Sequence, residues 1–230
     1  MNARPGGDPD IARILVTGSR DFDDEALVGT ALRAAEALVA ENRNCSGQDD
    51  FSSARVVHGD YAGADRLAKN LVESGALSDN APWRSWSHEP HPADWNVHGR
   101  AAGPIRNLEM IRAGADITIA FPRHTLDQAR AKVGSIGTWG TIEASVGAGI
   151  PTFVAWRGPS GDPILVPQGN AATQLAGQAL IEIARRTNPG IDPDTLNRVL
   201  ADTVDPWWSI DCGRAIASLP ANRWSGNGAF

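Results

Sequence analysis

The sequence predicts an α/β protein with a Rossmann-like three-layer sandwich. Two observations carry this prediction. Short apolar runs of strand character alternate with amphipathic helical segments, and the first two apolar runs each end in a glycine-containing turn. Because strands separated by helices pair in parallel, with helices on both faces, we expect a mainly parallel sheet of about five strands. A C-terminal helical extension is expected to follow it.

The expected elements follow one another from the first apolar run onward. Apolar runs predict strands, apolar positions at helical spacing predict helices, and Asp23 or Asp24 can cap the first helix. Strands are expected over residues 13–16, 54–58, 83–86, 116–121 and 151–156, and helices over 24–39, 64–73, 100–113 and 138–147.

Composition changes after residue 157, where a stretch rich in Pro and Gly precedes an all-helical tail. Two amphipathic helices are marked in the tail by Leu175, Ala179, Ile183 and Ala184, then by Leu196, Val199 and Leu200. The expected divisions are 1–10, disordered; 11–157, the Rossmann-like nucleotide-binding domain; 158–170, a linker; 171–221, the helical extension; and 222–230, a frayed C-terminus.

Composition excludes several classes of protein. The net charge of −6 argues against broad electrostatic capture of nucleic acid or of an anionic membrane. The sequence has no apolar run of the roughly 20 residues that span a bilayer, and its first ten residues lack the features of a secretory signal. Cys45 and Cys212 form neither a disulfide framework nor a zinc motif. We therefore expect a cytoplasmic protein.

Anions bind where helices begin at the carboxyl edge of a parallel sheet, because backbone N–H groups and the positive end of the helix dipole point there. Four segments should meet at this edge. They are Gly18, Ser19 and Arg20 after the first strand; Gly59, Gly63, Ala64 and Asp65 after the second; Arg106 and Asn107 on the third helix; and Gly137, Thr138, Trp139, Gly140 and Thr141 after the strand that ends at Phe121.

Each of these segments has a purely structural alternative. Gly18 can let a phosphate approach the backbone, which the Ser19 hydroxyl and the Arg20 guanidinium can then bind. The same tripeptide can be an ordinary strand-to-helix turn with a capping serine. Asp65 can likewise cap the helix that follows it, and Glu143 can interact favourably with the helix dipole without any catalytic role.

Taken in order, these motifs resemble the SLOG superfamily, the Rossmannoid group of the Lonely Guy phosphoribohydrolases, the DNA-processing protein DprA and the YspA/YpsA-related proteins. Gly18-Ser19-Arg20 resembles the opening GSR of that group, and residues 59–65 resemble its GxxxGAD. Residues 91–95 (HPADW) with 99–107 (GRAAGPIRN) resemble its most distinctive stretch. The YspA-like branch is the most similar, and the resemblance covers about residues 11–156.

The segment before Glu143 is similar to the Lonely Guy signature PGGxGTxxE, with Gly140, Thr141 and Glu143 in comparable places. This resemblance implies that Arg106 pairs with Glu143 as catalytic residues. The carboxylate would stabilise an oxocarbenium-like state or activate water, and the arginine would hold a 5′-phosphate. The segment departs from the signature by lacking Pro-Gly-Gly and by an insert over residues 123–133.

Arg106 has an alternative role as a structural partner of Glu109 or Asp116. His88, His91 and His98 are interpreted as part of a Pro-rich loop, so we expect no metal site, and no cofactor is expected. Among the tryptophans, packing is favoured for Trp95 and a ligand wall for Trp139. Trp207-Trp208 is expected to bury the tail against the sheet domain or a second subunit.

Three functions follow from these expectations. We favour a sensor or sequestering module that binds a nucleotide or nucleotide-derived small molecule. The alternatives are a nucleoside-monophosphate phosphoribohydrolase or related N-glycosidase using Glu143 and Arg106, and DprA-like binding of single-stranded nucleic acid, which the net charge disfavours. Of the roles open to the tail, which are a lid, a partner-binding element and a dimer interface, we favour the last and expect a homodimer.

Overall fold

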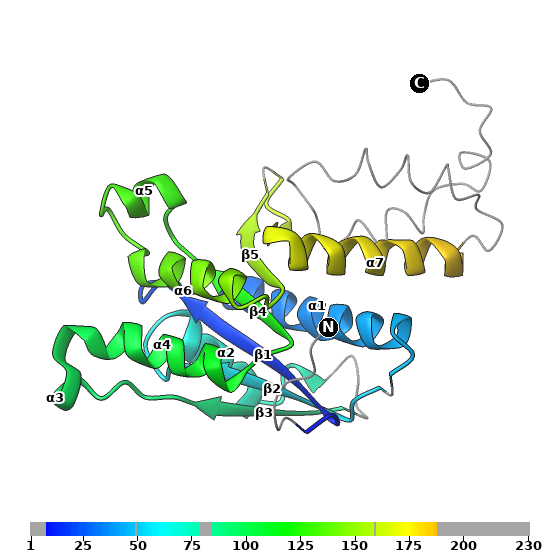
Figure 1. Ribbon diagram of the computed structural model, residues 1–230, viewed down its shortest axis with the longest axis horizontal. Coiled ribbons are helices and arrows are strands. Elements are labelled where there is room, and N and C mark those ends of the chain that lie inside the picture. The colour runs from blue at the N-terminus through cyan, green and yellow to red at the C-terminus, as the bar shows by residue number, and fades with distance from the viewer. Residues whose placement is uncertain (1–7, 49, 79–83, 159, 188–230) are drawn as a thin grey trace, which may run out of the picture.

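The computed structural model describes residues 8–48, 50–78, 84–158 and 160–187 and contains one sheet of six strands in the order β3-β2-β1-β4-β5-β6 (Figure 1). Neighbouring strands are parallel except for β5 and β6, which are antiparallel. This confirms the Rossmann-like, mainly parallel α/β fold. The strands are β1 (Ile11–Gly18), β2 (Ser53–His58), β3 (Ser85–Pro90), β4 (Ile117–Phe121), β5 (Thr152–Arg157) and β6 (Pro163–Gln168).

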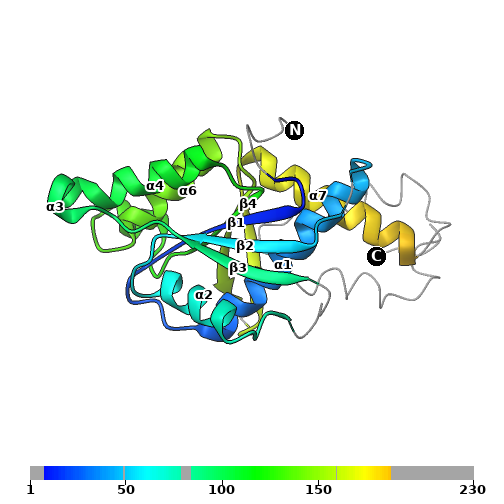
Figure 2. The same ribbon diagram turned by 90° about the horizontal axis from the view of Figure 1, so that it is seen from below.

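Helices cover both faces of the sheet, with α1, α2 and α7 on one face and α4 and α6 on the other (Figure 2). Two short helical segments, α3 and η2, lead into α4, and α5 lies in the connection between β4 and α6. The helices are α1 (Glu25–Cys45), α2 (Ala64–Glu73), α3 (Trp95–His98), η2 (Gly99–Ala101), α4 (Ala102–Ala113), α5 (Leu126–Arg130), α6 (Ile136–Gly147) and α7 (Gly169–Thr187).

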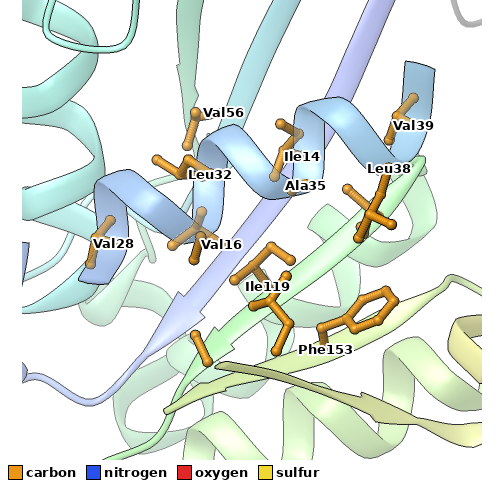
Figure 3. Close-up of a cluster of buried hydrophobic side chains, with 14 of the residues drawn as sticks. Ile14, Val16, Val28, Leu32, Ala35, Leu38, Val39, Val56, Ile119 and Phe153 are labelled. Atoms are coloured by element: carbon orange, nitrogen blue, oxygen red, sulfur yellow. The ribbon is translucent and has the colours of Figure 1, made fainter. Parts of the chain in front are cut away.

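Successive side chains of β1 point to opposite faces of the sheet, and this explains how helices pack on both faces. Ile14 and Val16 are fully buried and pack in the cluster under α1, where Leu32 meets them (Figure 3). Leu15, between them, packs on the other face with Met110 of α4. Burial of each such side chain stabilises the fold by about 1.5–3 kcal/mol. The central strand is therefore apolar on both sides, as expected for a parallel sheet.

Asp24 is the residue that caps α1. Its side chain accepts a hydrogen bond of 2.9 Å from the backbone N–H of Leu27, and it also pairs with Arg157 at the end of β5, with 2.8 Å between Nε and Oδ2. The pKa of Asp24 is lowered, chiefly by its hydrogen bond with Arg157. The Asp24 carboxylate thus caps α1 and connects it to β5 through the ion pair with Arg157.

The sixth strand corrects the prediction that residues 158–170 form a linker and that the sheet ends with the strand at 151–156. Ile164 and Leu165 are buried, and β6 pairs along its whole length with β5. Pro163 and Pro167 obscured the strand pattern in the sequence. Proline is tolerated there because β6 pairs with β5 only, and an edge strand leaves one set of backbone groups outside the ladder.

Other boundaries shift by a few residues. The third strand was expected over 83–86 but spans 85–90, so His88 lies in the sheet and not in a loop. Helix α1 continues to Cys45, six residues past its predicted end at residue 39. Helix α7, the first helix of the predicted extension, packs against α1 and contributes Leu175 and Ala179 to the main core.

The second tail helix, the C-terminal residues 222–230 and Trp207-Trp208 lie outside the described residues, as do residues 1–7 of the predicted disordered N-terminus. Within the described ranges, none of the helices has the length and apolar character that crossing a membrane requires.

Candidate functional site

A cleft of about 920 Å³ lies at the carboxyl ends of β1 and β2, between the turns that follow them and helices α4 and α6. Most of the residues predicted from the four sequence segments meet there. Those that line the cleft are Gly18, Ser19, Arg20, Asp65, Arg106, Asn107, Gly137, Thr138, Gly140 and Thr141.

Three predicted residues, Gly59, Gly63 and Ala64, support the cleft from behind and do not line it. Gly63 has a φ of +78°, and a Cβ there would lie 2.0 Å from the carbonyl oxygen of Ser19. A Cβ on Gly59 would overlap the Arg106 guanidinium. These glycines are therefore required for the β2–α2 turn to close against the β1–α1 turn and for Arg106 to reach its position.

Arg106 is partnered by Asp65 and not by Glu109, Asp116 or Glu143. The Arg106 Nη1 lies 3.8 Å from Asp65 Oδ2 and donates to the carbonyl oxygen of His91 at 3.2 Å, whereas its buried Nε has no partner. Helix α2 is preceded by Gly63 without a side-chain cap, so Asp65 is not the capping residue.

Burial dominates the electrostatics of this pair. It raises the pKa of Asp65 to about 6, an effect that the Arg106 charge and the backbone hydrogen bonds of Tyr61 and Gly59 oppose. Burial also lowers the pKa of Arg106, with Asp65 opposing that shift and the nearby charge of Arg20 adding to it. A carboxyl group with a raised pKa inside a cleft is typical of functional sites.

Ser135, which the sequence analysis did not single out, joins three segments at the inner wall. Its hydroxyl lies 2.6 Å from Ser19 Oγ and accepts hydrogen bonds from the backbone N–H groups of Arg123 and His124, at 3.0 and 3.1 Å. Ser135 has a φ of +55° and its side chain does not cap α6. The first turn of α6, with Gly137 and Thr138, therefore begins without a side-chain cap at the cleft.

Asn107 and Thr141 connect the two helices of the cleft wall. Asn107 Nδ2 donates to Thr141 Oγ1 at 2.7 Å, and that hydroxyl donates to the carbonyl oxygen of Gly137 at 2.8 Å. This network fixes α4 against α6 and orients the Asn107 amide. Both residues also line the cleft.

Trp139 and Glu143, both predicted for the site, lie outside the cleft lining. Trp139 packs against Ile142 and Val154 and donates from Nε1 to the carbonyl oxygen of His124 at 2.8 Å. Glu143 is exposed. The signature PGGxGTxxE places its acid three residues after the threonine, which here is Ala144. Ala144 lines the cleft, and Glu143 is one residue out of register.

Three residues at the mouth form a group that the sequence analysis did not predict as a unit. The Arg20 Cζ lies 4.6 Å from the ring centroid of Tyr61 and 5.8 Å from that of Trp95. We call Arg20, Tyr61 and Trp95 the mouth triad. Trp95 was expected to be packed, but it is 39% exposed. The position of Tyr61 inside a glycine turn was the available signal.

His58, also missed, is fully buried beneath the turn that carries Tyr61. Its Nδ1 accepts from the backbone N–H of Asp60 at 3.0 Å, and its Nε2 lies 3.1 Å from His88 Nδ1. Burial, with a smaller contribution from His88, lowers the pKa of His58 to about 4. The neutral imidazole therefore acts as a hydrogen-bond acceptor that positions the turn.

Comparison with known sequences finds a relative among phage proteins, and no family model matches the chain. The chain is 34% identical over 146 residues to the Gene 61 protein of Mycobacterium phage D29. The aligned region covers 61% of this chain and 94% of the phage protein. With that identity over nearly the whole length of the relative, the chain belongs to the family of the phage D29 Gene 61 protein.

Proposed function

We propose that the cleft binds a nucleotide or nucleotide-derived small molecule, and that the protein is a sensor or sequestering module for it. The observation that carries the proposal is a surplus of cations around the cleft. Arg20, Arg100 and Arg106 line it, against Asp21 and Asp65. A volume of about 920 Å³ is within the range of small-molecule sites.

The surplus is greater than the formal charges indicate. Asp21 lies near a cation outside the cleft, with 3.7 Å between its Oδ2 and the Arg123 Nε. Within the described ranges, Arg20 and Arg100 form no ion pair. An anionic group in the cleft would supply their counter-charge, and the uncapped first turn of α6 would supply backbone N–H donors.

We also propose that the family of this chain is part of the SLOG superfamily. The support is spatial as well as sequential. Gly18-Ser19-Arg20, Asp65 of the GxxxGAD motif and the Arg106-Asn107 pair come from three separate segments and line one cleft.

Binding without hydrolysis fits the placement of the acids. Glu143 is exposed outside the cleft, and Ala144 stands at the register position of the acid. Both carboxylates that line the cleft lie near arginines, Asp65 near Arg106 and Asp21 near Arg123. An N-glycosidase needs a carboxylate at the anomeric carbon. Glu143 therefore has no catalytic role in this proposal.

A thermal-shift screen of the full chain, freed of carried-over ligand, tests the binding function. Nucleoside mono- and diphosphates, cyclic dinucleotides and ADP-ribose are the probes, and at least one should raise Tm in a concentration-dependent manner. Glu143→Gln should leave that shift unchanged, and the nucleotide should be recovered intact. No shift with any probe would refute binding; release of free base that Glu143→Gln abolishes would establish the hydrolase.

The homodimer and the cytoplasmic location stay predictions. Light scattering of the full chain tests the first, with a mass near twice the 24.3 kDa of one chain expected.

A further inference from the structure

We infer that the mouth triad is a stacking subsite for a flat aromatic ring of the ligand, such as a nucleobase. The inference rests on the proposed function and assigns the ring-binding end of the same cleft. Three segments that are far apart in the sequence supply the triad: the β1–α1 turn, the β2–α2 turn and α3. All three side chains line the cleft.

The two rings do not stack on each other, so each keeps ring surface on which a ligand ring can stack. Their centroids are 6.2 Å apart and their planes are inclined by 52°, so they form an open angle and not a closed stack. Tyr61 is 38% exposed and Trp95 is 39% exposed. Two large adjacent aromatic side chains therefore keep much of their apolar surface in water at the entrance to a cleft, which is typical of binding sites.

Arg20 supplies the second half of the subsite. Its guanidinium lies over the Tyr61 ring and has no carboxylate partner within the described ranges. It is also close enough to Arg106 for its charge to lower the pKa of that group. An anionic ligand relieves this repulsion, and a guanidinium can stack on a base as well as on a tyrosine. Arg20 can therefore contact an aromatic ring while its charge faces the anionic part of the same ligand.

Isothermal titration of the full chain with AMP, GMP, CMP and UMP, and with ribose 5-phosphate, tests the inference. Base stacking on an aromatic side chain contributes about 1–3 kcal/mol, which corresponds to about 5-fold to 150-fold in affinity. At least one nucleotide should therefore bind 5-fold or more tightly than ribose 5-phosphate. Trp95→Leu and Tyr61→Leu should each weaken the binding of that nucleotide by 5-fold or more, without changing the affinity for ribose 5-phosphate.

Conservative and matched variants separate stacking from a structural role. Trp95→Phe and Tyr61→Phe should retain most of the affinity, and Val97→Ala, on α3 but outside the cleft lining, should retain all of it. Circular dichroism of each variant reports whether it folds. If a nucleotide binds no better than ribose 5-phosphate, or binds equally well to both leucine variants, the subsite is refuted while the proposed function stands. If none of the four nucleotides binds, the subsite is refuted, and the wider thermal-shift screen decides the proposed function.

Discussion

Arginine meets aromatic rings in two regions of this molecule, with opposite surroundings. Near the amino ends of the strands, Phe51 contacts two guanidinium groups, with its ring centroid 4.9 Å from the Cζ of Arg43 and 4.1 Å from that of Arg84. Phe51 is only 3% exposed. We call Phe51, Arg43 and Arg84 the closed cluster, and it contrasts with the exposed mouth triad at the carboxyl edge.

Carboxylates account for the difference. Arg84 binds Asp50, with 2.5 Å between Nη2 and Oδ2, and also binds Glu36, while Arg43 lies 3.7 Å from Asp116. The charges of both arginines in the closed cluster are thus balanced by carboxylates of the chain itself. Arg20 of the mouth triad is exposed and has no carboxylate partner among the described residues, so the same pairing of cation and ring is available for a ligand.

Glu89 and Asp65 show a similar contrast between a charged group that the chain satisfies and one in the cleft. Hydrogen bonds from Arg13 lower the pKa of Glu89 to about 2, so Glu89 contributes stability above its ordinary pKa of 4.5, and this contribution is lost as the pH falls toward 2. Burial raises the pKa of Asp65 to about 6, so Asp65 has the opposite effect: its contribution is present at low pH and is lost as the pH rises through 6. Of these two carboxylates, the fold favours the ionised form of Glu89 and disfavours that of Asp65 in the cleft.

The largest expected effect is on the closed cluster. Arg84→Ala removes a buried guanidinium from between Glu36 and Phe51, and breaking a buried ion pair typically costs about 3–5 kcal/mol. Urea unfolding should show a loss of about 3 kcal/mol. Arg20→Ala, the matched change at the mouth, should stay within about 0.5 kcal/mol of the parent. Equal losses in the two variants would remove the distinction between the clusters.

Arg20→Ala should instead weaken nucleotide binding. Loss of one charge-assisted contact with its stacking corresponds to about 1.4 kcal/mol, or roughly 10-fold in Kd. Arg20→Lys should recover only part of this because an ammonium group lacks the planar face. Titration calorimetry measures both. Unchanged affinity in Arg20→Ala would show that the mouth is merely an exposed surface.

Gly140→Ala should separate stability from binding on α6. A Cβ at Gly140 meets no atom within 4 Å, yet the residue lines the cleft. Alanine should stabilise the helix by up to about 1 kcal/mol. It should also narrow the cleft and weaken ligand binding several-fold. Gly147→Ala is the control, since it too has open space but lies outside the cleft lining; its affinity should not change. Equal affinity in both variants would argue against a ligand along this face.

The smallest expected effect is a pH dependence of binding. Protonation of Asp65 near pH 6 removes a negative charge from the cleft, so an anion of constant charge, such as a cyclic dinucleotide, should bind roughly 3-fold more tightly at pH 5 than at pH 7.5. Asp65→Asn should abolish the dependence, because the amide does not titrate. A profile that persists in Asp65→Asn would assign the titration to another group.

Much of the fold could be predicted because burial on both faces leaves a strong pattern. The run ending at Phe121 is buried at all five positions of β4, and the sequence identified it directly. β6 was missed because its two prolines are compatible with an edge strand but not with the usual strand pattern. The bounds predicted for β3 were wrong by a few residues because most of its positions are only partly buried, so its apolar pattern is weak.

At the site, sequence reasoning identified the segments but not the pairing within them. Glycines that permit close approach, such as Gly63, were visible as motifs, yet their contact with the Ser19 carbonyl oxygen depends on tertiary structure. Glu143 was chosen from the resemblance to the Lonely Guy signature, whereas the helical period places Ala144 on the cleft face. Ser135 was not singled out because its left-handed backbone leaves no signal in the sequence.

The hydroxyl of Ser135 also has a kinetic consequence. Because it already joins the Ser19 turn to the backbone of Arg123 and His124, the inner wall is ordered when folding is complete, and a ligand does not have to close it. Binding to such a preorganised wall loses little conformational entropy. The kinetics of ligand association should therefore show a single concentration-dependent phase, and the residence time should depend mainly on the contacts that the ligand makes at the mouth.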